Sequence, residues 1–87
     1  MSIVKTKLSY QQILARIKPI IKNKLCIEES RIVSNASFTN DLGADSLDNV
    51  ELSMEITNEF GFSFKDEDVA LIETVDDLVK MIDEYQK

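Results

Sequence analysis

The sequence has no histidine and no tryptophan, and it has one cysteine among its 87 residues. Without histidine, the chain has no Ser-His-Asp triad, no Cys-His pair and no imidazole metal ligand. One cysteine excludes an intramolecular disulfide and a thiolate zinc site, so we interpret Cys26 as a small apolar residue near a helix end rather than a reactive thiol. These absences predict that the chain is not an enzyme by itself.

Long apolar runs and calcium-binding loops are also lacking. The longest apolar runs are only a few residues long, which predicts that no segment spans a membrane. Two acidic stretches start at Asp41 and Asp66, but neither has the glycine that an EF-hand loop needs at its sixth position. We therefore expect no dedicated metal site.

The apolar residues that are present suffice for one small domain. Leu, Ile, Val and Phe together number 28, well above the share that disordered chains carry. The length predicts a single domain over residues 1–87. We expect a cytoplasmic monomer. An organellar location stays open, because residues 1–27 are basic and nearly free of acidic residues, as transit peptides are.

The charges are divided unevenly along the chain. Residues 1–40 carry seven basic and two acidic residues, whereas residues 41–87 carry three basic and fourteen acidic residues. The total of −6 therefore combines +5 in the first part with −11 in the second. An acidic surface repels nucleic acid and anionic lipid and attracts basic protein surfaces. We expect protein partners and no nucleic acid.

Hydrophobic periodicity predicts an all-α protein. Apolar residues from Tyr10 to Leu25 recur at helical spacing, and Ser9 with Gln12 has the form of a capping box, so we interpret this basic segment as the first helix of the fold rather than as a transit peptide. Pro19 lies inside the pattern, where it either kinks the helix or begins a second short turn. The expected architecture is a four-helix bundle with three longer helices, one short helix and a long loop between the first and second helices. The expected helices cover residues 9–25, 46–60 and 66–71, and the last helix is expected to start at residue 74. The long loop covers residues 26–45.

Three rows of side chains are expected along the helix at 46–60. An acidic row comprises Asp48, Glu51, Glu55 and Glu59. A core row comprises Leu52, Ile56 and Phe60, and a further apolar row comprises Leu47, Val50 and Met54. A bundle helix needs only one apolar face, so the further row either meets another protein or is buried under the long loop. Periodicity alone does not decide between these two interpretations.

The segment that enters this helix, from Asp41 to Asp48, reads DLGADSLD. Gly43 permits a tight backbone path in the loop. Ser46 is placed at the helix N-terminus, where backbone N–H groups and the helix dipole favour an anion such as a phosphate. A serine there can also be a plain N-cap, and for an arbitrary helix that interpretation is favoured.

The same segment closely resembles the phosphopantetheine attachment motif of the acyl carrier proteins of dissociated (type II) fatty acid synthesis. The resemblance extends to residues 35–38, 50–52, 59–61, 66–68 and 74–75, and residues 12–85 align without obvious gaps. It implies that a separate phosphopantetheinyl transferase (holo-carrier synthase) esterifies the Ser46 hydroxyl with 4′-phosphopantetheine from coenzyme A. The thiol of that arm would carry growing acyl chains as thioesters for fatty acid biosynthesis.

The resemblance also implies roles for two further sets of residues. Basic patches on fatty acid or polyketide synthesis enzymes would bind Asp45, Leu47, Asp48, Val50, Glu51, Met54 and Glu55. The acyl chain would enter a pocket lined by Phe38, Leu52, Ile56, Phe60, Phe64, Ile72 and Leu78, which without the family are plain core residues. Binding led by charge is expected to be fast, weak and sensitive to salt.

Four features depart from the family pattern. Thr57 and Asn58 stand where glutamate is common, and Phe64 with Lys65 replaces a common Ile-Pro pair. Ser53 places a hydroxyl at a position of the pocket that is usually apolar, and Pro19 in a basic first helix is also atypical. Two alternatives therefore stay open: a carrier dedicated to a specialised lipid or polyketide pathway, and an unmodified module that uses the acidic helix only to bind a basic partner.

Overall fold

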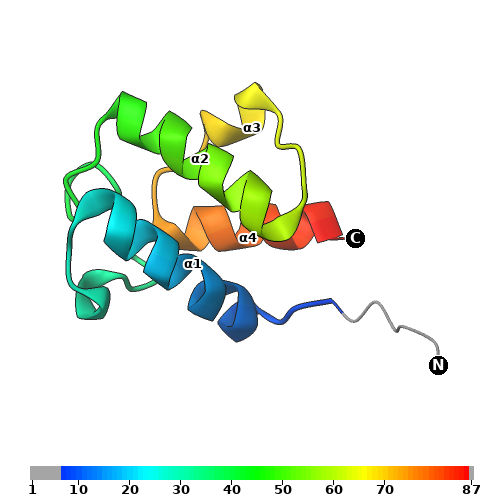
Figure 1. Cartoon of the computed structure of the whole chain (residues 1–87), viewed down its shortest axis with the longest axis horizontal. Coiled ribbons are helices and arrows are strands. Elements are labelled where there is room, and N and C mark those ends of the chain that lie inside the picture. Colours follow the sequence, from blue (N-terminus) through cyan, green and yellow to red (C-terminus); the bar gives the residue numbers. More distant parts are fainter. Residues whose placement is uncertain (1–6, 87) are drawn as a thin grey trace.

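The computed structural model describes residues 7–86, and α-helix dominates them (Figure 1). Part of the expected domain, residues 1–6 and residue 87, lies outside the described residues. The elements are α1 (Tyr10–Leu25), the 3-10 helix η1 (Glu29–Arg31), α2 (Ser46–Phe60), α3 (Asp66–Val69) and α4 (Val75–Gln86). The described residues thus form three longer helices and one short one, which confirms the predicted all-α bundle.

Helix α1 begins and ends where its local sequence predicts. The Ser9 hydroxyl accepts a hydrogen bond from the backbone N–H of Gln12, and the Gln12 side chain accepts one from the Ser9 N–H, which completes the capping box. The helix is unbroken through Pro19, which lies on its exposed side. Cys26 ends the helix in the left-handed region at φ 56°, so it lies at a helix end as predicted, and its side chain is exposed.

The loop between α1 and α2 closes one end of the bundle and is pinned to the start of α4 (Figure 1). Ile32, Phe38 and Leu42 are buried and anchor it, whereas Val33 is exposed. Residues 36–38 and 73–75 lie side by side: the Phe38 N–H donates to the Glu73 carbonyl, and the Val75 N–H donates to the Ala36 carbonyl. The sequence did not predict η1 or this pairing.

Helix α3 is shorter than the expected range 66–71. It ends at Val69 with Ala70 as its C-cap. The Ala70 N–H still donates to the Asp66 carbonyl, but the N–H groups of Leu71 and Ile72 donate to carbonyls three residues back and tighten the chain into a turn. Helix α4 starts as predicted, since the Thr74 hydroxyl accepts from the N–H of Asp77 at 3.1 Å.

The core lies where α1 packs against α2 and α4. Its helical members are buried at helical spacing, as predicted, which removes their apolar surface from water. They are Ile13, Leu14, Ile17, Ile21, Leu52, Ile56, Val75, Leu78, Val79 and Ile82. No helix in the described part of the chain is both long and apolar enough to cross a membrane.

A polar cluster fastens the start of α1 to the start of α4. The Tyr10 hydroxyl donates to an Asp76 carboxylate oxygen at 2.5 Å and lies 3.0 Å from the Ser34 hydroxyl in the loop. Asp76 also pairs with Lys80 at 3.2 Å. The hydrogen bond from Tyr10, and then that from Lys80, lowers the pKa of Asp76 below its ordinary value, while the Asp76 partner raises the pKa of Tyr10.

Candidate functional site

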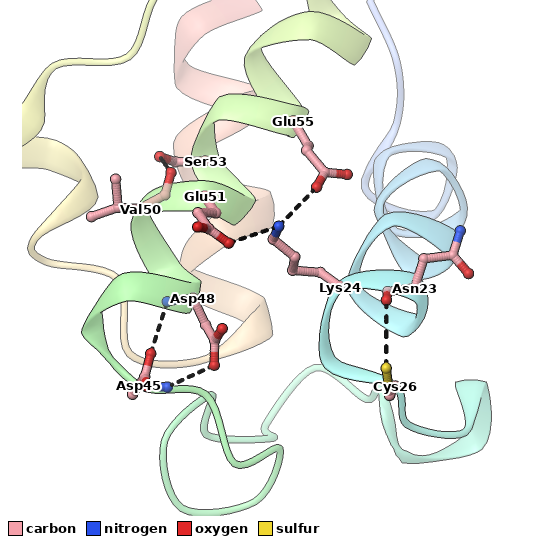
Figure 2. A network of polar contacts seen from close by, with 9 residues as sticks. All are labelled: Asn23, Lys24, Cys26, Asp45, Asp48, Val50, Glu51, Ser53 and Glu55. Atoms are coloured by element: carbon pink, nitrogen blue, oxygen red, sulfur yellow. Dashed lines mark hydrogen bonds and ion pairs between the residues drawn. The ribbon is translucent and has the colours of Figure 1, made fainter.

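The first turn of α2 is held by two carboxylates that cap each other's backbone. The Asp45 side chain accepts from the Asp48 N–H at 2.9 Å, and the Asp48 side chain accepts from the Asp45 N–H at 3.2 Å (Figure 2). Asp45 is therefore the N-cap, and Ser46 is the first residue of the helix. The interpretation that Ser46 serves only as the N-cap is wrong.

The loop before this turn is fixed by short backbone contacts. Gly43 adopts φ 73°, a left-handed conformation that glycine adopts without strain. The next residue, Ala44, is buried, and its N–H donates to the Phe38 carbonyl at 2.7 Å. The loop thus has a defined path up to the point where Ser46 begins the helix.

Ser46 is exposed, and its hydroxyl makes no hydrogen bond to any residue that the structure describes. It lies at the edge of a groove of about 490 Å³ between α2 and α3. A free, accessible hydroxyl at the positive end of a helix dipole fits a phosphoester, because the dipole favours negative charge there. The residues present therefore suit attachment of a phosphate-linked group at this position.

The groove leads to a small apolar cavity under α2. The cavity holds about 20 Å³, room for roughly one water-sized group, so it is too small for an acyl chain in this structure. It is lined by Phe38, Asn49, Leu52, Ser53, Ile56, Val69, Ile72 and Leu78. Four of these residues, Asn49, Ser53, Val69 and Ile72, also line the groove and form the boundary between the two.

The cavity contains five of the seven residues expected in the acyl pocket: Phe38, Leu52, Ile56, Ile72 and Leu78. Phe60 and Phe64 do not line it. They belong to an aromatic cluster with Phe62 and Tyr85 near the ends of α2 and α4, in which the Phe64 and Tyr85 ring centres lie 4.9 Å apart. Asn49 and Val69 also line the cavity and were not predicted from the sequence. Asn49 follows Ser46 by three residues on the same helix face, and that spacing would have indicated it.

The Ser53 hydroxyl is not left unpaired. It donates to the Val50 carbonyl within its own helix at 2.7 Å, so the cost of burying it without a partner does not arise. Ser53 lines both the groove and the cavity, and so lies at the boundary between them.

The further apolar row on α2 is on the surface. The side chains of Leu47, Val50 and Met54 are 62%, 52% and 62% exposed, so the alternative that Leu47 and Val50 are buried under the long loop is wrong. Leu71, in the turn after α3, is 75% exposed and was not singled out from the sequence. These residues leave apolar surface available on and near α2.

The acidic row on α2 is partly neutralised by α1. The Lys24 ammonium lies 2.8 Å from a carboxylate oxygen of Glu51 and 3.3 Å from one of Glu55, and Figure 2 shows it between the two. The hydrogen bond to Glu51 raises the pKa of Lys24. One helical turn beyond Glu55, Glu59 pairs with Arg16 at 3.4 Å. Each carboxylate in the row therefore has a partner within the chain, Asp48 through the cap.

Within residues 7–86, no group of three His, Cys, Asp or Glu side chains is arranged to hold a metal ion. The fold and the site together define a class: a small helical bundle that presents a free serine hydroxyl at the start of its second helix, beside a groove and an apolar cavity.

Comparison with known families identifies this class. The family model described as a phosphopantetheine attachment site matches residues 15–82, and the chain belongs to this family. It is a phosphopantetheine carrier protein, and the 4′-phosphopantetheine group is attached covalently in this family. The carrier domain is not itself catalytic, and its role implies contact with a phosphopantetheinyl transferase and with synthesis enzymes.

Proposed function

We propose that this chain is an acyl carrier protein whose Ser46 hydroxyl bears 4′-phosphopantetheine and which serves fatty acid biosynthesis. The observation that carries the proposal is the exposed Ser46 hydroxyl, free of hydrogen bonds to the described residues at the first position of α2. When bound, the group supplies a thiol that carries an acyl chain as a thioester. The capping carboxylates of Asp45 and Asp48 hold the first turn in place by hydrogen bonds in which the Ser46 hydroxyl takes no part.

The apolar cavity is the proposed shelter for the acyl chain. Its apolar walls are Phe38, Leu52, Ile56, Ile72 and Leu78. We propose that Phe60 and Phe64 line the acyl pocket only when the aromatic cluster opens. Because the cavity holds only about 20 Å³, accepting a chain requires α2 and α3 to separate. Helix α3 is short and its residues are exposed or only partly buried, which makes it the element that moves most easily.

The surface of α2 is the proposed docking site for partner enzymes. Leu47, Val50 and Met54 supply apolar contacts, and Asp45, Asp48, Glu51 and Glu55 supply negative charge to basic patches on the partner. A partner's Lys or Arg would replace Lys24 between Glu51 and Glu55. We include in the proposal that residues 1–87 form one carrier domain that acts as a cytoplasmic monomer.

A second candidate is a carrier for a specialised lipid or polyketide pathway. The observation that favours it is the polar boundary between the groove and the cavity, where Asn49 and Ser53 both lie. The two candidates share the arm on Ser46 and differ in the cargo.

Arm transfer tests the proposal directly. The purified chain is incubated with coenzyme A, magnesium and a phosphopantetheinyl transferase, and its intact mass is measured. We expect one arm on the wild type, none on Ser46→Ala, and one on Ser63→Ala, the matched control at another exposed serine. An arm on Ser46→Ala, or none on the wild type, would overturn the proposal. The intact mass of protein from its native host separates a carrier from an unmodified binding module, because only the carrier gains the arm there.

A further inference from the structure

The face of α2 that borders α3 changes from polar to apolar along its length. Ser46, Asn49 and Ser53 follow one another at intervals of three and four residues, so they lie on one side of the helix, and all three line the groove. The next residue of this face, Ile56, lines the cavity. At the helical rise per residue, Ser53 is about 10 Å along the axis from Ser46. Figure 2 shows Ser53 on the side of α2 away from Lys24.

The two polar residues that follow Ser46 on this face have unused capacity for hydrogen bonds. The Asn49 side chain makes no hydrogen bond to the described residues, so both its N–H donors and its carbonyl acceptor are free. The Ser53 hydroxyl proton is committed to the Val50 carbonyl, which leaves its oxygen free to accept. Together they can donate to a ketone oxygen and accept from a hydroxyl.

An acyl chain that enters the cavity must pass this boundary. The terminal carbons go in first, among Leu52, Ile56 and Leu78, so the carbons nearest the thioester stay beside Asn49 and Ser53. A saturated chain would remove water from both polar side chains and return no hydrogen bond, which is unfavourable. A hydroxyl or ketone near the thioester would replace that water.

We propose that the groove selects acyl groups with an oxygen on the β-carbon, as in 3-hydroxyacyl and 3-oxoacyl chains, over saturated chains of the same length. Asn49 and Ser53 are the specificity-determining residues. The inference rests on the proposed attachment at Ser46. A site that hydrogen-bonds a substituent discriminates against the analogue without it, because the polar groups of the site are then left unpaired.

The test compares two cargoes on the same protein. A phosphopantetheinyl transferase loads the apo protein from octanoyl-coenzyme A or from (3R)-3-hydroxyoctanoyl-coenzyme A, and hydroxylamine cleavage of each thioester is timed. Each rate is divided by that of the corresponding free acyl-pantetheine, which removes differences in intrinsic reactivity. We expect the 3-hydroxyoctanoyl thioester to be protected about three- to tenfold more than the octanoyl thioester, as one or two net hydrogen bonds would give.

Two variants and one control assign the effect to the boundary. Ser53→Ala and Asn49→Leu are expected to bring the ratio to about one or below. Thr57→Val is the matched control, because the Thr57 hydroxyl also donates to a carbonyl of α2, at 2.9 Å, yet it lines neither the groove nor the cavity. Ser53→Ala favours the helix by propensity, so it keeps the test valid if Asn49→Leu does not fold.

The outcomes distinguish this inference from the proposed function. If the wild type accepts both cargoes and protects them equally, or protects octanoyl better, the inference is overturned and the carrier role stands. The inference is also overturned if Ser53→Ala keeps the wild-type ratio or if Thr57→Val loses it. If neither cargo is loaded, the proposed attachment at Ser46 itself has failed.

Discussion

Asp45 has two roles that one pair of substitutions can separate. Its carboxylate caps α2 by accepting from the Asp48 N–H at 2.9 Å, and its charge belongs to the proposed partner surface. Asp45→Ala removes both the cap and the charge. Asp45→Asn keeps a side-chain oxygen that can accept the same hydrogen bond and removes only the charge.

The structure sets the size of each effect. Loss of an N-cap costs about 0.5–2 kcal/mol, which in a domain of this length lowers the melting temperature by roughly 4–8 °C per kcal/mol. Asn is as good an N-cap as Asp, so Asp45→Asn loses only the attraction of the charge to the helix dipole, about 0.3–1 kcal/mol and screened by salt. In high salt we expect the Asn variant to melt within about 2 °C of the wild type and the Ala variant clearly lower.

The assay combines thermal unfolding, followed by far-UV circular dichroism in high salt, with the initial rate of arm transfer in low salt. We expect Asp45→Asn to keep its stability and yet to accept the arm several times more slowly, because the transferase meets one negative charge fewer beside Ser46. Asp45→Asn melting as low as Asp45→Ala would refute the capping argument. Unchanged arm transfer in the Asn variant would remove the Asp45 charge from the partner surface.

Three further predictions follow from other contacts. Lys24→Met frees Glu51 and Glu55 on α2 and should raise the rate of transfer to basic partner enzymes at low salt. Lys22→Met is the control, because Lys22 has no ion pair to a described residue, and it should leave this rate unchanged. Equal effects of the two substitutions would contradict the idea that Lys24 shields the two glutamates. The depressed pKa of Asp76 stabilises the fold above its ordinary value of 3.8, and this contribution is lost as the pH falls through the lower, folded-state value. Tyr10→Phe should therefore reduce stability at neutral pH and lose less of it on acidification in urea titrations, and an unchanged acid dependence would contradict this reasoning. Ile56→Ala, fully buried beside the cavity, should cost about 2–5 kcal/mol in the free energy of unfolding, and a cost well below 2 kcal/mol would show that the neighbouring side chains collapse into the space.

The limits of the long helices could be predicted because the signals that set them are local. The Ser9 capping box starts α1, and Gly61, at φ 79°, ends α2 with its N–H on the Thr57 carbonyl. These contacts span three or four residues and depend little on the rest of the fold. The burial of the apolar rows followed for the same reason, since helical period alone decides which residues share a face.

The site was predicted only in part, because sequence patterns do not state which helices face each other. The sequence placed Ser46 at the start of a helix and Leu52 and Ile56 on its core face, and both placements hold. It also grouped Phe60 with them, since the spacing of four continues, but the chain turns at Gly61 and Phe60 packs with Phe62. Asn49 shares a helix face with Ser46 by its spacing, but it was passed over because the sequence does not show that α3 borders this face.

The sequence by itself determined that this protein is a small helical bundle with a serine at the start of its second helix, and the DLGADSLD segment indicated the family. Only the tertiary structure decided how its charges are used. The basic N-terminal part and the acidic remainder meet where α1 packs on α2, and Lys24 and Arg16 pair there with Glu51, Glu55 and Glu59. These pairs join residues that are 27 or more positions apart. They form because α1 and α2 pack by their core faces, which brings Arg16 and Lys24 next to the acidic row of α2.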